Sequence, residues 1–192
     1  MADILYGVKL LVLEELDETT QIPKVGGTKC YATTGKSVEL DPVVSEGEEK
    51  VARSDTKILA IVRTPDLLYG YNLKLVDNVF DVSAAALIEG GAIKKDATGK
   101  VIGYDSSLLS AGVTMKPFRA SIYIANYEGD SIVNYVKLVL NKCTGKAPAI
   151  KVGEDFFAPE FEIKAREATR AGLPVKSLEY VDTLPNVETM GI

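Results

Sequence analysis

The chain of 192 residues contains no histidine and no tryptophan. Without histidine it cannot form a Ser-His-Asp or Cys-His catalytic arrangement, and it cannot supply a histidine metal ligand. Proton transfer near neutral pH would need a carboxylate, lysine, tyrosine or cysteine with a shifted pKa. The chain also lacks the side chain that most often changes charge between about pH 5 and 8.

Cysteine is scarce, since Cys30 and Cys143 are the two in the chain and they form no CxxC pair. Two cysteines cannot complete a zinc site, so we expect two reduced thiols, as is usual in a cytoplasmic protein. The first residues lack the basic and apolar regions of a signal peptide, and apolar runs such as 84–88 span about five residues. A bilayer-spanning helix needs about 20 apolar residues, so no membrane segment is expected.

Positive charge is also in short supply. The 22 lysines and arginines are outnumbered by 27 aspartates and glutamates, which gives a net charge of −5. Proteins that hold a phosphate backbone by counterion release need a basic excess, so specific nucleic-acid binding is not expected. Ordinary fractions of hydrophobic (46%) and charged (26%) residues predict one globular domain over residues 1–192, with 183–192 as a loose tail.

Alternating apolar and polar residues dominate the chain. This period of two predicts strands over 36–41, 68–77 and 161–165. Apolar and β-rich runs predict further strands over 4–13, 57–63, 118–125, 132–141 and 175–181. A helix is predicted where Asp81 or Ser83 can cap an alanine-rich run that ends at Gly90. A hairpin with its turn at 96–99 is predicted over 92–107. We therefore predict a mostly-β sandwich or barrel with one short helix against its side.

The stretch 42–55 is polar and charged, and we predict a long loop there between two strands. Loops of this length are uncommon unless they have a function. The side chains of interest are Val43, Val44, Glu46, Glu48, Glu49, Lys50 and Arg53. The glutamates have the wrong spacing for a calcium loop, and Lys50 and Arg53 compete for their carboxylates. A solvated or interface loop is favoured over a metal site.

Two further stretches contain residue types that occur in functional sites, but the spacing of these residues does not match such sites. Residues 32–37 end in Gly-Lys-Ser like a phosphate-binding loop, but Cys30 stands where that motif needs glycine, and a strand follows instead of a helix. Glu160 and Glu162 face the same side of a strand, whereas glycosidases need two carboxylates across a cleft. No catalytic residue, metal or cofactor is therefore expected.

The order of the segments resembles the major tail protein (tail tube protein) family of long non-contractile-tailed bacteriophages and related phage-tail-like particles. The resemblance spans about residues 1–183. It is carried by LYGYNL at 68–73, FDV at 80–82, KPFRA at 116–120, SIYIANYEG at 121–129, YVKLVLNKC at 135–143 and FEIKAR at 161–166.

The resemblance implies a β-sandwich or barrel-like tail tube fold with a flanking helix and no catalytic residue. It implies homohexameric rings that stack into a hollow virion tail tube, assembled in the host bacterial cytoplasm, through which DNA passes without specific binding. The implied partners are further copies of the chain, the tape measure protein, the distal tail protein and the tail terminator. In this family a long loop between two early strands reaches the adjacent ring, and 42–55 matches it by position and charge.

Two assignments follow as expectations. The seven side chains named above for 42–55 form the ring-to-ring contact. The polar strand faces with Ser37, Glu39, Asp41, Glu160 and Glu162 line the lumen, because their opposite faces are apolar and acidic residues repel DNA. Three alternatives stay open: the tube of a phage-tail-like bacteriocin without a genome, a contractile-tail tube, and a small-molecule-binding or enzymatic β-barrel protein.

Overall fold

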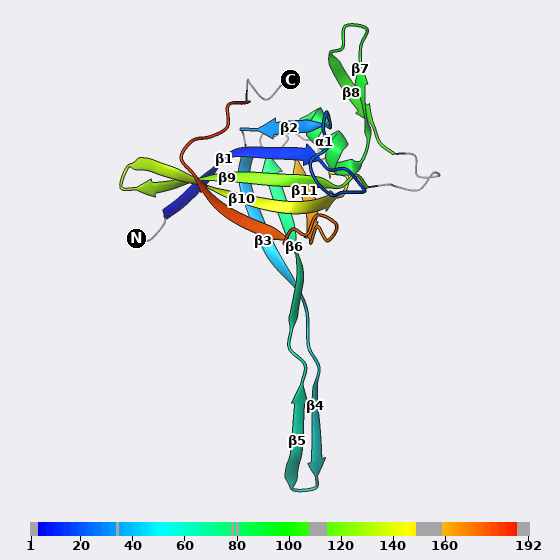
Figure 1. Ribbon diagram of the computed structural model, residues 1–192, viewed down its shortest axis with the longest axis vertical. Helices are drawn as coiled ribbons and strands as arrows, with labels where there is room; N and C mark the ends of the chain where they lie inside the picture. Colours follow the sequence, from blue (N-terminus) through cyan, green and yellow to red (C-terminus); the bar gives the residue numbers. More distant parts are fainter. Residues whose placement is uncertain are drawn as a thin grey trace, which may run out of the picture.

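The computed structural model describes residues 4–33, 35–77, 79, 81–107, 115–148 and 159–187. Within these residues it contains twelve strands and one short helix, and the predicted mostly-β, sandwich-like fold is confirmed (Figure 1). The elements are β1 (Ile4–Glu15), β2 (Lys29–Ala32), β3 (Gly35–Ser45), β4 (Glu49–Ser54), β5 (Lys57–Arg63), β6 (Leu67–Asp77), α1 (Val82–Glu89), β7 (Ala92–Lys95), β8 (Val101–Asp105), β9 (Phe118–Glu128), β10 (Ser131–Gly145), β11 (Glu160–Arg166) and β12 (Lys176–Val181).

An eight-stranded sheet in the order β2-β1-β9-β10-β11-β6-β3 forms the body, with β12 paired to β10. Strand β10 changes partner along its length, because residues 135–140 pair with β12 and residues 142–145 pair with β11. Figure 1 shows β1, β9 and β10 crossing the direction of β3 and β6, so the sheet bends over itself into two layers. Strands β1 and β3 come close together without pairing.

The core lies between these layers because each strand presents alternate residues to it. Leu73 and Leu75 of β6 are buried, while Lys74 between them extends into solvent. The largest buried side chains come from both layers and the helix: Leu11, Leu13, Leu73, Leu75, Leu87, Ile88, Phe118, Ile122, Leu140, Phe161 and Ile163. Burying each such side chain stabilises the fold by roughly 1.5–3 kcal/mol, so this shared core holds the layers together.

Helix α1 packs on one end of the body. The Asp81 carboxylate accepts a hydrogen bond from the backbone N–H of Ser83 at 2.8 Å, and Gly90 ends the helix with a φ of 81°, as predicted. The helix lies so close to β10 that a Cβ on Gly145 would be 2.1 Å from Cγ2 of Ile88. Glycine at position 145 is therefore required for this contact.

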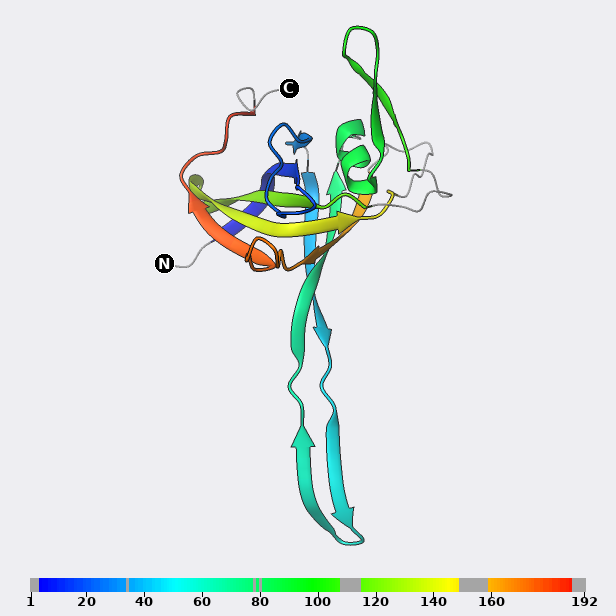
Figure 2. The ribbon, with the colours of Figure 1, turned by 45° about the vertical axis from the view of Figure 1, so that its right-hand side comes forward.

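The chain runs outward along β3 and β4 and returns along β5 and β6, since β3 pairs with β6 and β4 pairs with β5. Figures 1 and 2 show residues 45–67, which we call the arm, extending far from the body as two strands. The prediction of a loop over 42–55 is wrong, because this stretch completes β3 and then forms β4. Both faces of the arm meet solvent, so its residues do not alternate in the way that a half-buried strand requires.

A second hairpin, β7–β8, projects from the end of the body opposite the arm (Figures 1 and 2). Its turn is held by Asp96, whose carboxylate accepts hydrogen bonds from the backbone N–H groups of Thr98 at 2.8 Å and Lys100 at 3.0 Å. Gly99 in the same turn has a φ of 86°. The predicted hairpin over 92–107 is thereby confirmed, with its turn where the sequence indicates it.

The predicted strands over 118–125 and 132–141 are confirmed as β9 and β10, which form a hairpin with Gly129 in its turn. Strand β2 was not expected. It is four residues long, and it is held by its pairing with β1, a contact that local sequence pattern does not reveal.

A small second cluster lies on the outer side of β1 and β9, where Leu10, Val12 and Tyr123 are buried. Leu184 and Val187 pack against this cluster, in the stretch for which the sequence indicates a loose tail. Residues 188–192 of that stretch lie outside the described residues.

Candidate assembly surfaces

The arm exposes aliphatic side chains along both of its faces. Cross-strand partners share a face, so Val51 lies beside Ile61 on one face and Lys50 lies beside Val62 on the other. The exposed fractions of Ile58, Leu59, Ile61 and Val62 lie between 57% and 68%. Aliphatic side chains of this kind are usually buried. The arm therefore has the residue composition of an interface, although its side chains are exposed in the single chain.

Hydrogen bonds hold the arm straight where β3 and β6 end and β4 and β5 begin. The backbone N–H of Gly47 donates to the Asp66 carboxylate at 2.8 Å, and that of Glu48 donates to Oγ1 of Thr64 at 2.8 Å. The backbone N–H of Thr64 donates in turn to the carbonyl oxygen of Glu48 at 3.0 Å. Cross-strand bonding therefore continues through the link, which gives the arm one direction relative to the body.

The residues predicted as the ring-to-ring contact all lie on the outgoing strand of the arm or at its base. Val43 and Val44 belong to β3, Glu46 and Glu48 to the link, and the remaining three to β4. The returning strand, β5 with its run KILAIVR, is the strand predicted over 57–63, and it pairs with β4 where the sequence indicated a loop. A short apolar run of this kind is typical of a strand buried on both faces, whereas every residue of β5 is exposed in this chain.

The residues predicted to line the lumen share one face of the sheet. Glu39 of β3 and Glu162 of β11 are both register partners of Lys74 on β6. In the same way, Ser37 and Glu160 flank Val76, and Asp41 lies opposite Asn72. We call this surface, formed by β3, β6, β11 and the end of β10, the charged face.

The charged face carries lysines beside its acids. Lys74 pairs with Glu160 at 2.8 Å, and Lys146 pairs with Glu162 at 2.7 Å. The hydrogen bond from Lys146 lowers the pKa of Glu162, and the hydrogen bond to Glu160 raises the pKa of Lys74. Lys164 also shares this face, by its register with Asn72. The paired lysines neutralise part of the acidic charge, so this face would repel DNA less than its acids alone predict.

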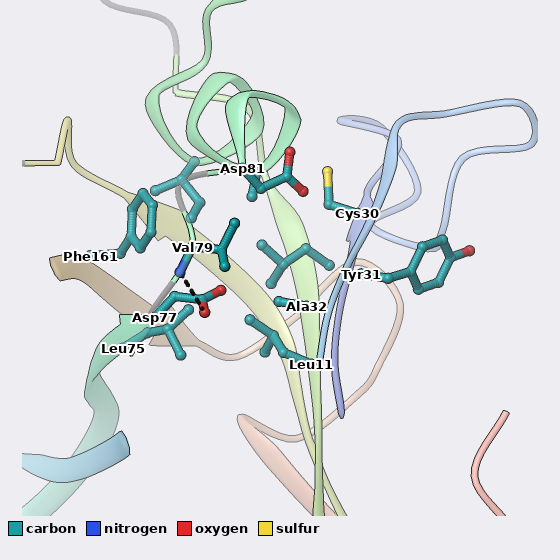
Figure 3. A pocket seen from close by; sticks show the side chains of 12 residues that line it. Leu11, Cys30, Tyr31, Ala32, Leu75, Asp77, Val79, Asp81 and Phe161 are labelled. Carbon is teal, nitrogen blue, oxygen red and sulfur yellow. Dashed lines mark hydrogen bonds between the residues drawn. The ribbon is translucent and has the colours of Figure 1, made fainter. Parts of the chain in front are cut away.

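A groove of about 470 Å³ opens at the end of the body near α1. Its walls come from β2, the segment after β6, the start of α1 and β8: Tyr31, Ala32, Val79, Asp81, Val82 and Val101. Figure 3 shows the inner part, where Asp77 and Asp81 approach Val79 beneath the helix and the ring of Tyr31 points outward. None of the described residues that line the groove is basic, so its character is aliphatic and acidic.

Cys30 lies at the inner end of the groove and Cys143 lies in the core, and both are unpaired, as the sequence predicts. Burial raises the pKa of each thiol to about 12, with the nearby Asp81 carboxylate adding to the shift for Cys30. Neither thiol is a nucleophile or metal ligand at neutral pH, because both roles need the thiolate.

The stretch resembling a phosphate-binding loop passes from β2 into β3, which begins at Gly35, and Thr34 lies outside the described residues. Over the described part of the chain, no three histidine, cysteine, aspartate or glutamate side chains gather closely enough to hold a metal ion. Within the same residues, no helix is long and apolar enough to cross a membrane.

No protein-family model matches the sequence, and no curated protein is significantly similar to it. Among solved structures, the chain is similar to the cap that terminates the tube of the anti-feeding prophage. The two share 11% sequence identity over 93% of this chain and 94% of the other, with a TM-score of 0.36. A similarity at this level assigns neither a fold nor a function to the chain.

Proposed function

We propose that the chain is a non-enzymatic structural subunit that assembles with copies of itself into a phage-tail-like tube. The observation that carries this proposal is the arm, a two-stranded hairpin with aliphatic side chains exposed on both faces. An isolated two-stranded hairpin is marginally stable in water, so such an arm is best explained as half of an interface.

A second copy of the chain is the partner that we favour. The arm leaves one end of the body, and in this proposal the surface that receives it lies elsewhere on the next copy. Such head-to-tail contacts propagate into rings, stacks or filaments instead of closing as a dimer. The sequence resemblance to tail tube proteins supplies the specific form, which is hexameric rings stacked into a hollow tube.

In this proposal the arm residues Val44, Glu48, Lys50 and Arg53 contact the adjacent ring, and the charged face lines the lumen. Tape measure, distal tail and tail terminator proteins would be the partners in a virion tail. The lysines on the charged face favour, as a second candidate, the tube of a phage-tail-like bacteriocin, since a tube that carries no genome needs no repulsion of DNA.

Electron microscopy of the concentrated, purified chain tests the proposal. We expect hollow rods or rings whose length increases with protein concentration. Analytical ultracentrifugation would detect the opposite result. A chain that stays monomeric at every concentration, with or without a tape measure or tail-tip partner, contradicts assembly. A monodisperse monomer that binds a small molecule would favour the alternative of a β-barrel binding protein.

A further inference from the structure

We infer that the groove beside α1 receives the tip of the arm from a second copy of the chain. The inference rests on the proposed function, and it identifies the surface on the next copy that the arm contacts. Two features carry it, namely the chemistry of the tip and of the groove, and their positions at opposite ends of the molecule.

The tip of the arm is aliphatic and carries a net positive charge, because Arg53 and Lys57 flank a single acid, Asp55. Arg53 is the register partner of Ile58, and Lys57 follows the turn directly. Leu59, at the irregularity in the β4–β5 pairing, is 68% exposed. Among the residues that the structure describes, neither Arg53 nor Lys57 forms an ion pair, so both charges are free to meet acids on another molecule.

The groove offers the complementary chemistry. Val79 and Val101 on its rim are 53% and 38% exposed, which provides an apolar surface for Ile58 and Leu59. Asp77 and Asp81 give it negative charge, and its volume of about 470 Å³ lies within the range of sites that enclose a ligand. A basic aliphatic tip entering an acidic aliphatic groove buries apolar area and brings opposite charges together.

The geometry excludes contact within one chain and favours stacking. Figures 1 and 2 show the arm at one end of the body and α1, which forms part of the groove wall, at the other. The tip of a chain therefore cannot reach its own groove. Because tip and groove are different surfaces, each docked copy presents a new free groove or tip, and the contact repeats along an axis.

Engineered disulfide formation tests this contact. In the variant Leu59→Cys with Val101→Cys, assembled protein should give a ladder of cross-linked oligomers on a non-reducing gel. The matched control combines Leu59→Cys with Ile102→Cys, because Ile102 is more exposed than Val101, at 63% against 38%, but points to the opposite face of β8. The control should lack the ladder. Native Cys30 and Cys143 are buried and do not take part.

A second measurement uses the wild-type chain, so it does not depend on a variant folding. Zero-length carbodiimide treatment of tubes should join Lys57 to Asp81, the more exposed of the two groove acids, a link that peptide mass spectrometry identifies and that must connect two chains. Tubes that form with neither this link nor a ladder above the control overturn the groove assignment and leave the proposed function standing. Failure of the wild-type chain to assemble at all contradicts the proposed function, and this inference with it.

Discussion

Gly47 and Thr64 face each other so closely that a Cβ on Gly47 would lie 1.8 Å from the carbonyl oxygen of Thr64. No side chain fits there without displacing the backbone of the arm at its base. The cross-strand hydrogen bonds between Glu48 and Thr64 are in the same place. Glycine at position 47 thus permits the pairing that fixes the direction of the arm.

Gly47→Ala should therefore impair assembly while leaving the body folded. We expect the free energy of unfolding to change by less than about 1 kcal/mol, because the arm contributes no side chain to the core. Chemical denaturation would measure this change, and light scattering would measure assembly. Gly103→Ala is the control, since a Cβ there meets nothing within 4 Å. Normal assembly of Gly47→Ala would show that the direction of the arm does not matter.

Removing the arm should produce a folded subunit that cannot stack. Ser45 and Leu67 are the last register partners of β3 and β6, so an Asn-Gly turn can join them directly in place of residues 46–66. Circular dichroism should show a cooperative, wild-type-like transition, and microscopy should show no tubes. Full-length tubes from this variant would rule out the arm as the connector. Deletion of 44–53 alone is a poorer test, because it would leave β5 without its partner.

Single substitutions on the arm should separate stability from assembly. Ile61 is 57% exposed, so Ile61→Asn should change the free energy of unfolding by no more than about 0.5 kcal/mol. If the arm packs on another copy, however, the same change places an amide in an apolar contact and should raise the concentration needed for assembly. Val25→Asn, at a fully exposed position on the body, should leave that concentration unchanged. Equal effects of the two substitutions would contradict an apolar role for the arm.

The buried thiols predict how stability depends on pH. Folding raises the pKa of Cys30 and Cys143 from 9.0 to about 12, so above pH 9 the unfolded chain loses protons that the folded chain retains. The free energy of unfolding should therefore fall between about pH 9 and 12, by about 1.4 kcal/mol per pH unit for each thiol. Below pH 9 the thiols should cause no pH dependence.

Denaturation curves of the wild type and of a Cys30→Ala, Cys143→Ala variant would isolate this contribution, since tyrosines and lysines titrate equally in both. The variant should be less stable at pH 8, because Cys143→Ala leaves a small cavity in the core. It should nevertheless lose less stability than the wild type as the pH rises, and it should still assemble. Parallel curves for the two proteins would contradict the pKa assignment.

The sequence located the strands of the body because burial of one face imposes alternation, as in Leu73, Lys74 and Leu75 of β6. The same reasoning failed for the outgoing strand of the arm, where neither face is buried and EKVARS shows no period, whereas the β-rich run KILAIVR was correctly predicted as a strand. Charged residues without alternation were interpreted as a loop, although pairing with β5 makes them a strand.

The two candidate surfaces differ in how far the sequence reveals them. Polarity alone grouped Glu39 with Glu162, and the register through Lys74 confirms that they share a face. The compensating lysines were not expected, because a partner on a neighbouring strand has no fixed spacing in the sequence. The groove could not be predicted for the same reason, since Tyr31, Val79 and Val101 meet only through the fold.

The charged face lines the lumen in our proposal, and accessibility in assembled tubes tests this placement. Glu39→Cys puts a reactive thiol on an exposed position of that face, and the buried native cysteines should not react. In the free subunit the new thiol should react with both a small maleimide and a maleimide attached to a large polymer. In tubes the small reagent should still react, while the polymer should be excluded by the walls of the channel.

Val25→Cys is the comparison, since its position is fully exposed on the body and should accept both reagents if it stays on the outside. Polymer labelling of Glu39→Cys in tubes would place the charged face on the outer surface, and loss of labelling by both reagents would place it between subunits; either result contradicts the lumen assignment.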